Sequence, residues 1–314
     1  MTMSEVAQMT VDFTREAERY RHELRVHCYR LLGSFDEAED LVQETFLKAW
    51  RSRDTFEGRS SFRAWLYRIA TNACFDVINR RPAQTTTEDM PAADVPWLQP
   101  FPDALLDAEP DEEVVARETI ELAFLAAVQH LPAKQRAVLV LRDVLGWPAN
   151  ETAALLEDTV PAVNSALQRA RVTMRKHLPQ RRADWSGDSN PREKAVVRRL
   201  VEATERCDVE LMASTLREDI TWTMPPQPEW YVGRDAVMEL WTPVMVGPEA
   251  FGEWKTLETR ANRQPAIAAY ARKPGEEHFR PVALDVLRIE DGEIAEIITF
   301  PSDRFPLFGL PATL

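Results

Sequence analysis

Residues 131–178 constrain the chain most, because they form two apolar-periodic runs joined by a short break at residues 157–159. The first run carries Ala153, Ala154 and Leu155, which are small or aliphatic side chains that suit a close crossing of two helices. Asp158 or Thr159 can cap the second run, and Pro161 falls in its first turn, where a missing N–H costs nothing. The pattern predicts a helix-turn-helix.

The second helix of this pair has two different faces. Val163, Leu167, Ala170 and Met174 recur at helical spacing on one side. The opposite side carries amides, a hydroxyl and guanidinium groups, from Asn164, Ser165, Gln168, Arg169, Arg171 and Arg175. Amides pair with adenine, and arginine pairs with guanine or phosphate, so this face suits a DNA major groove. A basic amphipathic helix is as often a solvated surface, and spacing alone leaves both interpretations open.

The composition is that of an ordinary globular protein of two or three domains, with 45% hydrophobic and 28% charged residues in 314. No apolar run approaches the length of a membrane span, and no signal-peptide pattern opens the sequence, so we expect a cytoplasmic protein. Cys28, Cys74 and Cys207 lie far apart without a C-x-x-C pair. We therefore expect no disulfide framework, no metal site and no cofactor.

The net charge of −13 argues at first against DNA binding, because the phosphate backbone rewards positive charge. The distribution of charge weakens that objection. Residues 83–116 contain nine acidic residues and neither Lys nor Arg, so much of the negative charge lies in one connecting segment. We predict that this segment is an acidic linker between two helical domains.

The preceding segment, residues 12–82, is predicted to be almost entirely helical. One of its helices carries Ala38, Val42 and Phe46 on its apolar side. The other side carries the regular polar stripe Asp40, Gln43, Glu44 and Lys48. Such a stripe is usually a solvated face, and its functional interpretation is a docking face for a partner.

A third helix begins after Ser60 or Ser61 and ends before Pro82, which cannot continue it. Along this helix and its preceding loop, cations and polar groups alternate with aromatic rings, at Phe56, Arg59, Ser61, Arg63, Trp65, Tyr67, Asn72, Arg80 and Arg81. This combination can hold single-stranded nucleic acid by stacking bases and neutralising phosphates. We expect Trp65 at least to be a core residue instead.

The two helical segments together resemble a known family. HCYRLLGSFDEAEDLVQETFLKAWR, followed by FEGRSSFRAWLYRIATN, is similar to region 2 of the extracytoplasmic-function sigma factors of the sigma-70 family. LPAKQRAVLVLRDVLGW and the later QRAR resemble their region 4. Both matches lie in the family order and are joined by a polar linker.

The resemblance implies an alternative sigma factor that binds core RNA polymerase and promoter DNA and carries no catalytic residue. Asp40, Gln43, Glu44 and Lys48 match the polymerase-binding face. Phe56, Arg59, Ser61, Asn72, Arg80 and Arg81 match the region that captures the downstream promoter element. Asn164, Ser165, Gln168, Arg169, Arg171 and Arg175 match the helix that reads the upstream element.

One position departs from the family pattern. Many members carry a basic residue on each side of the recognition-helix serine, whereas Asn164 and Ala166 flank Ser165 here. We hypothesise weaker or altered recognition of the upstream element.

The chain continues beyond a Gly/Ser/Asn/Pro-containing segment for more than a hundred residues. Helices are predicted first, then strand-like runs at residues 261–271 and 278–289, and an Asp291-Gly292 hairpin turn before residues 293–300. DITWTMPP, WYVGRDA and VLRIEDGEIAEI resemble the SnoaL-like branch of the NTF2-like fold, which implies an α+β cone with a curved antiparallel sheet.

Members of that fold include isomerases that use a carboxylate or histidine in an apolar pocket. The candidate pocket residues here are Trp222, Met224, Trp230, His278 and Asp285, with Asp219 as a further acid. Fold alone does not carry activity, so a regulatory role in cis is favoured over small-ligand sensing and catalysis. The alternatives are a SnoaL/isomerase-type enzyme or ligand sensor tethered to a DNA-binding module, and an activator that binds duplex DNA alone.

The predicted fold class is therefore multidomain, with two all-α sigma domains followed by an α+β NTF2/SnoaL-like cone. The expected boundaries are residues 12–82 for sigma region 2, 83–116 for the acidic linker, 117–179 for sigma region 4, 180–191 for a second linker and 192–314 for the SnoaL-like domain.

Overall fold

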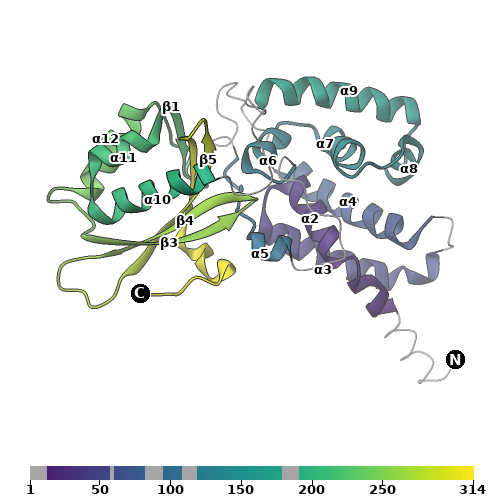
Figure 1. Cartoon of the computed structure of the whole chain (residues 1–314). Helices are drawn as coiled ribbons and strands as arrows, with labels where there is room; N and C mark the ends of the chain where they lie inside the picture. The colour runs from purple at the N-terminus through teal and green to yellow at the C-terminus, as the bar shows by residue number, and fades with distance from the viewer. Residues whose placement is uncertain (1–12, 57–59, 82–94, 108–118, 179–190) are drawn as a thin grey trace, which may run out of the picture. The chain divides into compact units, whose positions relative to one another are not determined.

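The computed structural model describes residues 13–56, 60–81, 95–107, 119–178 and 191–314 (Figure 1). The chain falls into two compact units. Unit 1 comprises residues 1–91 and 124–178, and unit 2 comprises residues 92–123 and 179–314. Within the described ranges, no helix combines the length and the apolar character needed to cross a membrane.

The first half of unit 1 is helical, as predicted. Its main elements are α2 (Arg21–Leu32), α3 (Phe35–Arg51), the short 3-10 turn η1 (Arg53–Thr55) and α4 (Phe62–Arg80). Gly33 ends α2 in the left-handed conformation, at φ 71°, with its N–H donating to Tyr29 O. Ser34 and Ser61 cap α3 and α4, since their hydroxyls accept from Glu37 N and Ala64 N at 3.3 and 3.1 Å.

The second half of unit 1 contains the predicted helix-turn-helix. The elements are α6 (Leu122–Gln129), whose first two residues belong to unit 2, α7 (Ala133–Leu139), the π-helical turn η3 (Val140–Val144), α8 (Ala149–Leu155) and α9 (Val160–His177). The turn passes through Glu157 at φ 51°. Thr159 then caps α9 by accepting from Ala162 N at 3.3 Å, so the predicted break and cap are confirmed.

The two halves of unit 1 pack together around the buried side chain of Arg136 on α7. Its guanidinium donates to Leu31 O of α2 at 2.5 Å and to Leu131 O at 3.1 Å. It also donates to Gln129 Oε1 and Gln129 O, at 2.6 and 2.7 Å. A ring contact adds to this interface, with the Tyr67 and Trp147 centroids 5.0 Å apart. The predicted regions 2 and 4 therefore form one packed unit.

Unit 2 combines helices with a six-stranded sheet. The elements are α5 (Asp103–Leu106), α10 (Pro191–Arg206), α11 (Val209–Thr215), β1 (Leu216–Thr223), β2 (Trp230–Val232), α12 (Arg234–Met245), β3 (Glu253–Ala261), β4 (Gln264–Arg272), β5 (Arg280–Glu290), β6 (Glu293–Pro301) and η4 (Ser302–Phe308). The strand order is β2-β1-β6-β5-β4-β3. The sheet was expected to be antiparallel throughout. It is mixed, because β1 and β6 run parallel.

Strand β3 and its hairpin with β4 were not predicted from the sequence. The strand expected at residues 261–271 is the last residue of β3, a turn at Asn262 and Arg263, and β4. Both turn residues have positive φ, 57° and 61°, a conformation that asparagine tolerates better than most residues. The predicted Asp291-Gly292 turn is confirmed, with φ of 53° and 83°.

The core of unit 2 lies between the sheet and its helices. α10, α11 and α12 lie along one face of the sheet (Figure 1), and this face buries Leu200, Met212, Val237, Ile267 and Ile297. On another part of the sheet, Tyr270 packs edge-on against Phe305 of η4, at a centroid distance of 5.1 Å. The helices and sheet thus form the predicted α+β cone.

Candidate functional site

The polar stripe of α3 is exposed along one face. Asp40, Gln43 and Glu44 are exposed, and Lys48 is half-buried. Lys48 Nζ lies 2.7 Å from Glu44 Oε1, one helical turn away. Leu47 stands within the stripe with 56% of its surface exposed. A single exposed leucine is ordinary on a protein surface, so its exposure alone does not assign this face to a partner.

The predicted downstream-element residues divide into exposed and packed groups. Asn72 and Arg80 are exposed on α4, and Ser61 is exposed at its N-cap. The Phe56 ring packs 5.1 Å from Trp65, which is buried as expected. Arg59 lies outside the described residues.

Arg81 does not face solvent in this structure, in contrast to its predicted DNA-facing role. Its guanidinium forms an ion pair with Glu37 and donates to Leu32 O at 2.9 Å and to Gln129 Oε1 at 3.3 Å. Burial lowers the pKa of Arg81, with Glu37 opposing that shift. The side chain therefore ties the end of α4 to neighbouring elements of unit 1.

Arg63, another cation of α4, is held between two rings. It contacts the Glu23 carboxylate through two nitrogens, at 2.6 and 2.8 Å. Its guanidinium carbon lies 5.3 Å from the Tyr67 centroid and 5.4 Å from the Trp147 centroid. Burial alone would lower the pKa of Arg63. The hydrogen bond to Glu23, together with the charges of Glu23 and Tyr67, raises the pKa by more than burial lowers it, so the pKa of Arg63 is raised. Part of the expected promoter-binding helix is thus covered by the helix-turn-helix half.

Helix α9, the predicted recognition helix, exposes the residues expected to read DNA. Asn164, Ser165, Gln168, Arg169, Arg171 and Arg175 are all exposed. Arg171 forms a two-point ion pair with Asp143, at 2.7 and 2.8 Å, which orients its guanidinium. The opposite face buries Val163, Leu167, Ala170 and Met174, as the periodicity predicts.

Ala166 was counted with Asn164 as a departure from the family pattern on the DNA-facing side, and the structure corrects this for Ala166. It is buried with only 4% of its surface exposed, on the packing face of α9. A small residue there completes the contact between helices, so its lack of charge does not remove a contact on the exposed face. Only Asn164 departs from the pattern at an exposed position.

The linker contacts the β3–β4 turn within unit 2, which was not predicted from the sequence. Asn262 Oδ1 accepts from Phe101 N at 2.8 Å, and Asn262 N donates to Phe101 O at 2.8 Å. Asn262 Nδ2 donates to Ile120 O at 2.7 Å. One buried side chain therefore binds Phe101 of the linker and Ile120, which lies just past the predicted end of the linker.

Neighbouring residues reinforce this contact, which we call the linker clamp. It comprises Asn262, Arg263 and Gln264 with their partners Phe101, Asp103, Ile120 and Leu122. Gln264 Oε1 accepts from Leu122 N at 2.9 Å. Asp103 Oδ1 accepts from Arg263 N at 2.7 Å. The sequence signal for this turn is Asn262-Arg263 within a β-rich stretch. That signal does not identify the residues that the turn contacts.

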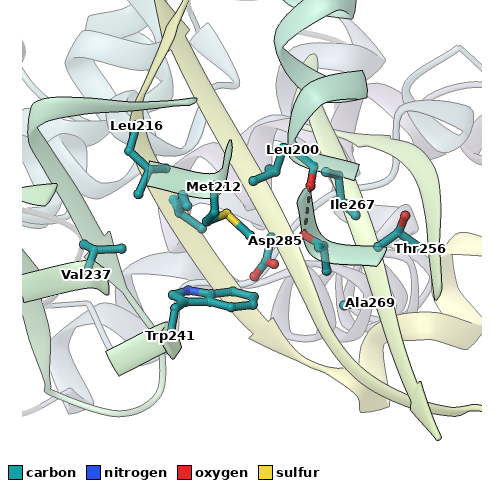
Figure 2. Close-up of a pocket in the computed structure, with 11 residues that line it drawn as sticks. Leu200, Met212, Leu216, Val237, Trp241, Thr256, Ile267, Ala269 and Asp285 are labelled. Carbon is teal, nitrogen blue, oxygen red and sulfur yellow. Dashed lines mark hydrogen bonds between the residues drawn. The ribbon is translucent and has the colours of Figure 1, made fainter. Parts of the chain in front are cut away.

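The candidate pocket is a cavity between the helices and the sheet of unit 2 (Figure 2). Eleven residues line it, among them Met212, Trp241 and Asp285. Trp222 borders the site by stacking on Trp241 at a centroid distance of 5.2 Å. Met224 packs against the same core without lining the cavity.

Two predicted pocket residues require correction. Trp230 lies on β2 with 43% of its surface exposed, and His278 is exposed between β4 and β5. Neither lines the cavity, because each follows a turn that directs it to the surface. Asp219 is also exposed, and its hydrogen bonds to Arg217 lower its pKa.

Asp285 is the one predicted acid that lies in the cavity. Its Oδ1 accepts from Thr299 Oγ1 at 2.6 Å, and Thr299 Oγ1 in turn accepts from Trp222 Nε1 at 2.7 Å. Burial raises the pKa of Asp285 to about 6, although the hydrogen bond from Thr299 acts in the opposite direction. Over the described part of the chain, no group of three or more side chains could hold a metal ion.

Comparisons with known proteins match all three segments. The Sigma-70 region 2 family matches residues 17–83, and the Sigma-70 region 4 family matches residues 121–174. The SnoaL-like domain family matches residues 197–297.

Two relatives span most of the chain. This chain is 39% identical over 320 residues to the ECF RNA polymerase sigma factor SigG of Mycobacterium tuberculosis, and the match covers 96% of this chain and 85% of that protein. It is 29% identical to SigJ of the same organism, covering 90% and 89%. The crystal structure of SigJ has the same fold, with a TM-score of 0.61 at 23% identity over 95% of this chain and 99% of that chain.

Proposed function

The chain belongs to the extracytoplasmic-function sigma factors of RNA polymerase, and we propose that its C-terminal domain regulates promoter binding in cis through the linker clamp. As an alternative sigma factor, it binds core RNA polymerase and directs transcription initiation at promoters. The observation that carries the proposal is the bonding of Asn262 to both Phe101 and Ile120.

The clamp shortens the linker. A fully extended chain from residue 101 to residue 120 covers about 65 Å. Asn262 accepts a hydrogen bond from Phe101 N at 2.8 Å and donates one to Ile120 O at 2.7 Å. While both bonds hold, the residues between Phe101 and Ile120 add almost nothing to the distance that the chain can span between regions 2 and 4. Regions 2 and 4 read separate promoter elements, so they need that length. We infer that the clamp opposes promoter binding and that its release favours it.

Contacts in unit 1 act in the same direction. Tyr67 and Arg63 of α4 contact the Trp147 ring, and Arg68 lies 3.7 Å from Glu157. A factor that engages the downstream element through α4 has to give up these contacts. The closed arrangement of unit 1 and the clamped linker therefore describe a factor before promoter binding.

The site residues follow from this proposal. The polymerase-binding face is Asp40, Gln43, Glu44 and Lys48, with Leu47 added because of its exposure. Asn72 and Arg80 contact the downstream element together with the segment around Phe56 to Ser61, and Arg81 joins them only after its present contacts break. The exposed face of α9 reads the upstream element, and Asn164 weakens that reading.

The proposal also covers where the factor acts, its lack of catalysis and its domain boundaries. The factor acts in the cytoplasm, where promoter DNA and polymerase are found, and none of its residues performs catalysis. Its domain boundaries are residues 12–82, 83–116, 117–179, 180–191 and 192–314. The contacts at Phe101 and Asp103 support treating the linker as part of the C-terminal regulatory module, and the contact at Ile120 extends that module to the start of region 4.

Transcription by core polymerase with full-length Asn262→Gly tests the proposal. Glycine tolerates the φ of 57° at this position, so the change removes the side-chain bonds to Phe101 and Ile120 without straining the turn. We expect more transcript than with the wild-type factor at equal concentration.

Asp291→Gly is the matched control, since it makes the same kind of change at the β5–β6 turn, where φ is 53°. Its transcript level should equal that of the wild type. Equal output from wild type and Asn262→Gly, or an equal rise with Asp291→Gly, would contradict regulation through the clamp.

A further inference from the structure

The outer face of α10 carries a group of cations in its first half. Lys194, Arg198 and Arg199 are all exposed, and they lie on neighbouring turns of the helix. The opposite face buries Val196 and Leu200 in the core of unit 2. The three cations therefore point away from that core, and we call them the basic patch.

The charges of the basic patch have no carboxylate partner among the described residues. Arg198 Nε donates to the neutral oxygen of Lys194 O at 3.3 Å. Arg199 Nη2 donates to Ser214 Oγ at 2.9 Å, which is also neutral and which orients the guanidinium. The patch is thus a concentration of unpaired positive charge in a chain whose net charge is −13.

Other exposed cations of unit 2 are paired. Arg206, in the last turn of α10 itself, lies 2.7 Å from Glu202. Arg280, in the first turn of β5, lies 3.5 Å from Glu276. Surface pairing is therefore common in this domain, and the basic patch departs from it.

The order of charges along α10 is not the order that stabilises a helix. Helix α3 has acids in its first turn and cations in its last, which complements the helix dipole. Apart from Glu193 and Arg206, α10 has the reverse order, with the basic patch in its first half and Glu202 and Glu205 in its second. Helix stability does not account for the patch, which favours a role in binding an anion.

Promoter DNA is the anion that the chain brings within reach of α10. Helix α9 ends at His177 and α10 begins at Pro191, so their connection spans at most about 50 Å when fully extended. Duplex DNA rises about 3.4 Å per base pair. While α9 occupies the upstream element, the start of α10 therefore stays within about 15 base pairs of it.

The side chains of the patch indicate the kind of contact. Lysine and arginine neutralise phosphates, and α10 contains no Asn or Gln that could pair with adenine. Region 2 and the downstream element lie on one side of the upstream element, which leaves the DNA on its outer side free. We expect a contact to the phosphate backbone there, independent of base sequence.

We propose that the basic patch of α10 binds the backbone of duplex DNA on the outer side of the upstream promoter element. The proposal rests on the reading of that element by α9, and it uses no residue of the linker clamp. The clamp restrains the free factor, whereas the patch holds the C-terminal domain on the DNA once the linker is released.

The test is equilibrium binding of the polymerase holoenzyme to two fragments of a promoter identified by sequencing the transcripts that the holoenzyme makes. One fragment ends at the upstream element, and the other continues for about 15 base pairs beyond it, which is the reach of α10. With the wild-type factor we expect the longer fragment to bind about tenfold more tightly at low salt. This preference should shrink as the salt concentration rises.

Lys194→Gln/Arg198→Gln/Arg199→Gln removes the basic patch and keeps residues of good helix propensity. On the longer fragment, the slope of log affinity against log salt should become shallower by about 0.9 for each lost phosphate contact. The preference for the longer fragment should fall toward that made by polymerase alone. Any upstream contact of polymerase itself is the same for both factors, so the ratio of the two preferences isolates the patch.

Arg206→Gln/Lys273→Gln/Arg280→Gln is the matched control, because it removes the same charge from exposed positions of unit 2 outside the patch. Thermal unfolding of both triple variants establishes that they fold. The control should keep the wild-type preference and slope, and an equal loss in both variants would assign the effect to net charge and overturn the proposal.

Two further outcomes would overturn it. The first is an unchanged preference in the patch variant, which would make the patch a solvated surface. The second is weaker binding of that variant to core polymerase without DNA, which would make polymerase the partner. Asn262→Gly keeps the patch and should keep the preference for the longer fragment, so failure of the clamp proposal and failure of this one are distinguishable.

Discussion

Arg136 in unit 1 and Asp285 in unit 2 are both buried charged side chains, and their surroundings differ. Four oxygen atoms accept hydrogen bonds from the Arg136 guanidinium, on Leu31, Gln129 and Leu131. A single hydroxyl donates to Asp285, and the rest of its carboxyl group faces a cavity. The difference separates a buried charge whose hydrogen bonds organise a fold from a buried charge that receives a single hydrogen bond from its surroundings.

One buried titratable group in each unit contributes to the pH dependence of stability, and the two contributions have opposite directions. His27 in unit 1 is buried, and burial together with the nearby charges of Arg30 and Arg63 lowers its pKa to about 3. The unfolded chain therefore takes up this proton first, and unit 1 loses stability as pH falls below 6.5. The raised pKa of Asp285 means that the folded state of unit 2 keeps its proton longer, so unit 2 loses stability as pH rises from 3.8 through about 6.

The largest expected effect is that of Arg136→Met. The change leaves several buried oxygen atoms without donors, and each such group costs about 1–3 kcal/mol. Unit 1 should lose on the order of 4 kcal/mol of unfolding free energy in denaturant titrations. Arg169→Met, at an exposed position of α9, is the control and should change stability little. Similar losses for both variants would show that Arg136 does not organise unit 1.

Asp285→Asn should stabilise unit 2, whereas Arg136→Met destabilises unit 1. A shift of the pKa from 3.8 to about 6 corresponds to about 3 kcal/mol, which the variant should regain at pH 8. At pH 4 the wild-type carboxyl is protonated in the folded state, so most of this gain should vanish. Hydrogen exchange of the β5 and β6 amides measures the stability of unit 2 separately. A variant less stable than the wild type at pH 8 would break the comparison.

His27→Gln should flatten the pH response of unit 1. For the wild type we expect a loss of about 2 kcal/mol between pH 6.5 and pH 5, because each pH unit in this range contributes about 1.4 kcal/mol. Glutamine can retain a hydrogen bond to Thr71 Oγ1, which lies 2.9 Å from His27 Nε2. Hydrogen exchange of the α2 and α4 amides at the two pH values is the measurement. An unchanged pH dependence in the variant would assign the response to another group.

Trp222→Phe should have the smallest effect. The change removes the donor to Thr299 Oγ1 and keeps most of the ring, so we expect a loss of about 1 kcal/mol in unit 2. Thr299 loses its fixed orientation as well, which should raise the pKa of Asp285 further. Carboxyl titration followed by NMR gives this pKa directly. A lower pKa of Asp285 in the variant would contradict the role of the Trp222–Thr299–Asp285 chain.

Much of the helical half could be predicted from the sequence, because caps and apolar spacing are local signals. Ser61 and Thr159 cap the helices where expected, and Val163 and Leu167 lie on the buried face of α9. The sheet was harder to predict, because β3 carries alternating charges on a strand whose pairing with β4 is decided by tertiary contacts.

The candidate sites show the same division between local and distant signals. The exposure of the α9 residues follows from helical spacing, whereas the burial of Arg81 depends on Glu37 and Gln129, which are distant in the sequence. His278 looked like a pocket residue because of its chemistry, yet its position in a connection between strands exposes it. The linker clamp joins Asn262 to residues more than a hundred positions away, which no local pattern reveals.

The central claim is that the C-terminal domain holds the linker in the free factor and releases it when the factor binds a promoter. Hydrogen exchange of the Phe101 and Leu122 amides, which donate to Asn262 and Gln264, tests this claim most directly. We predict that both amides are protected in the free factor and exchange much faster in the complex with core polymerase and promoter DNA. Equal protection in the two states would contradict the account.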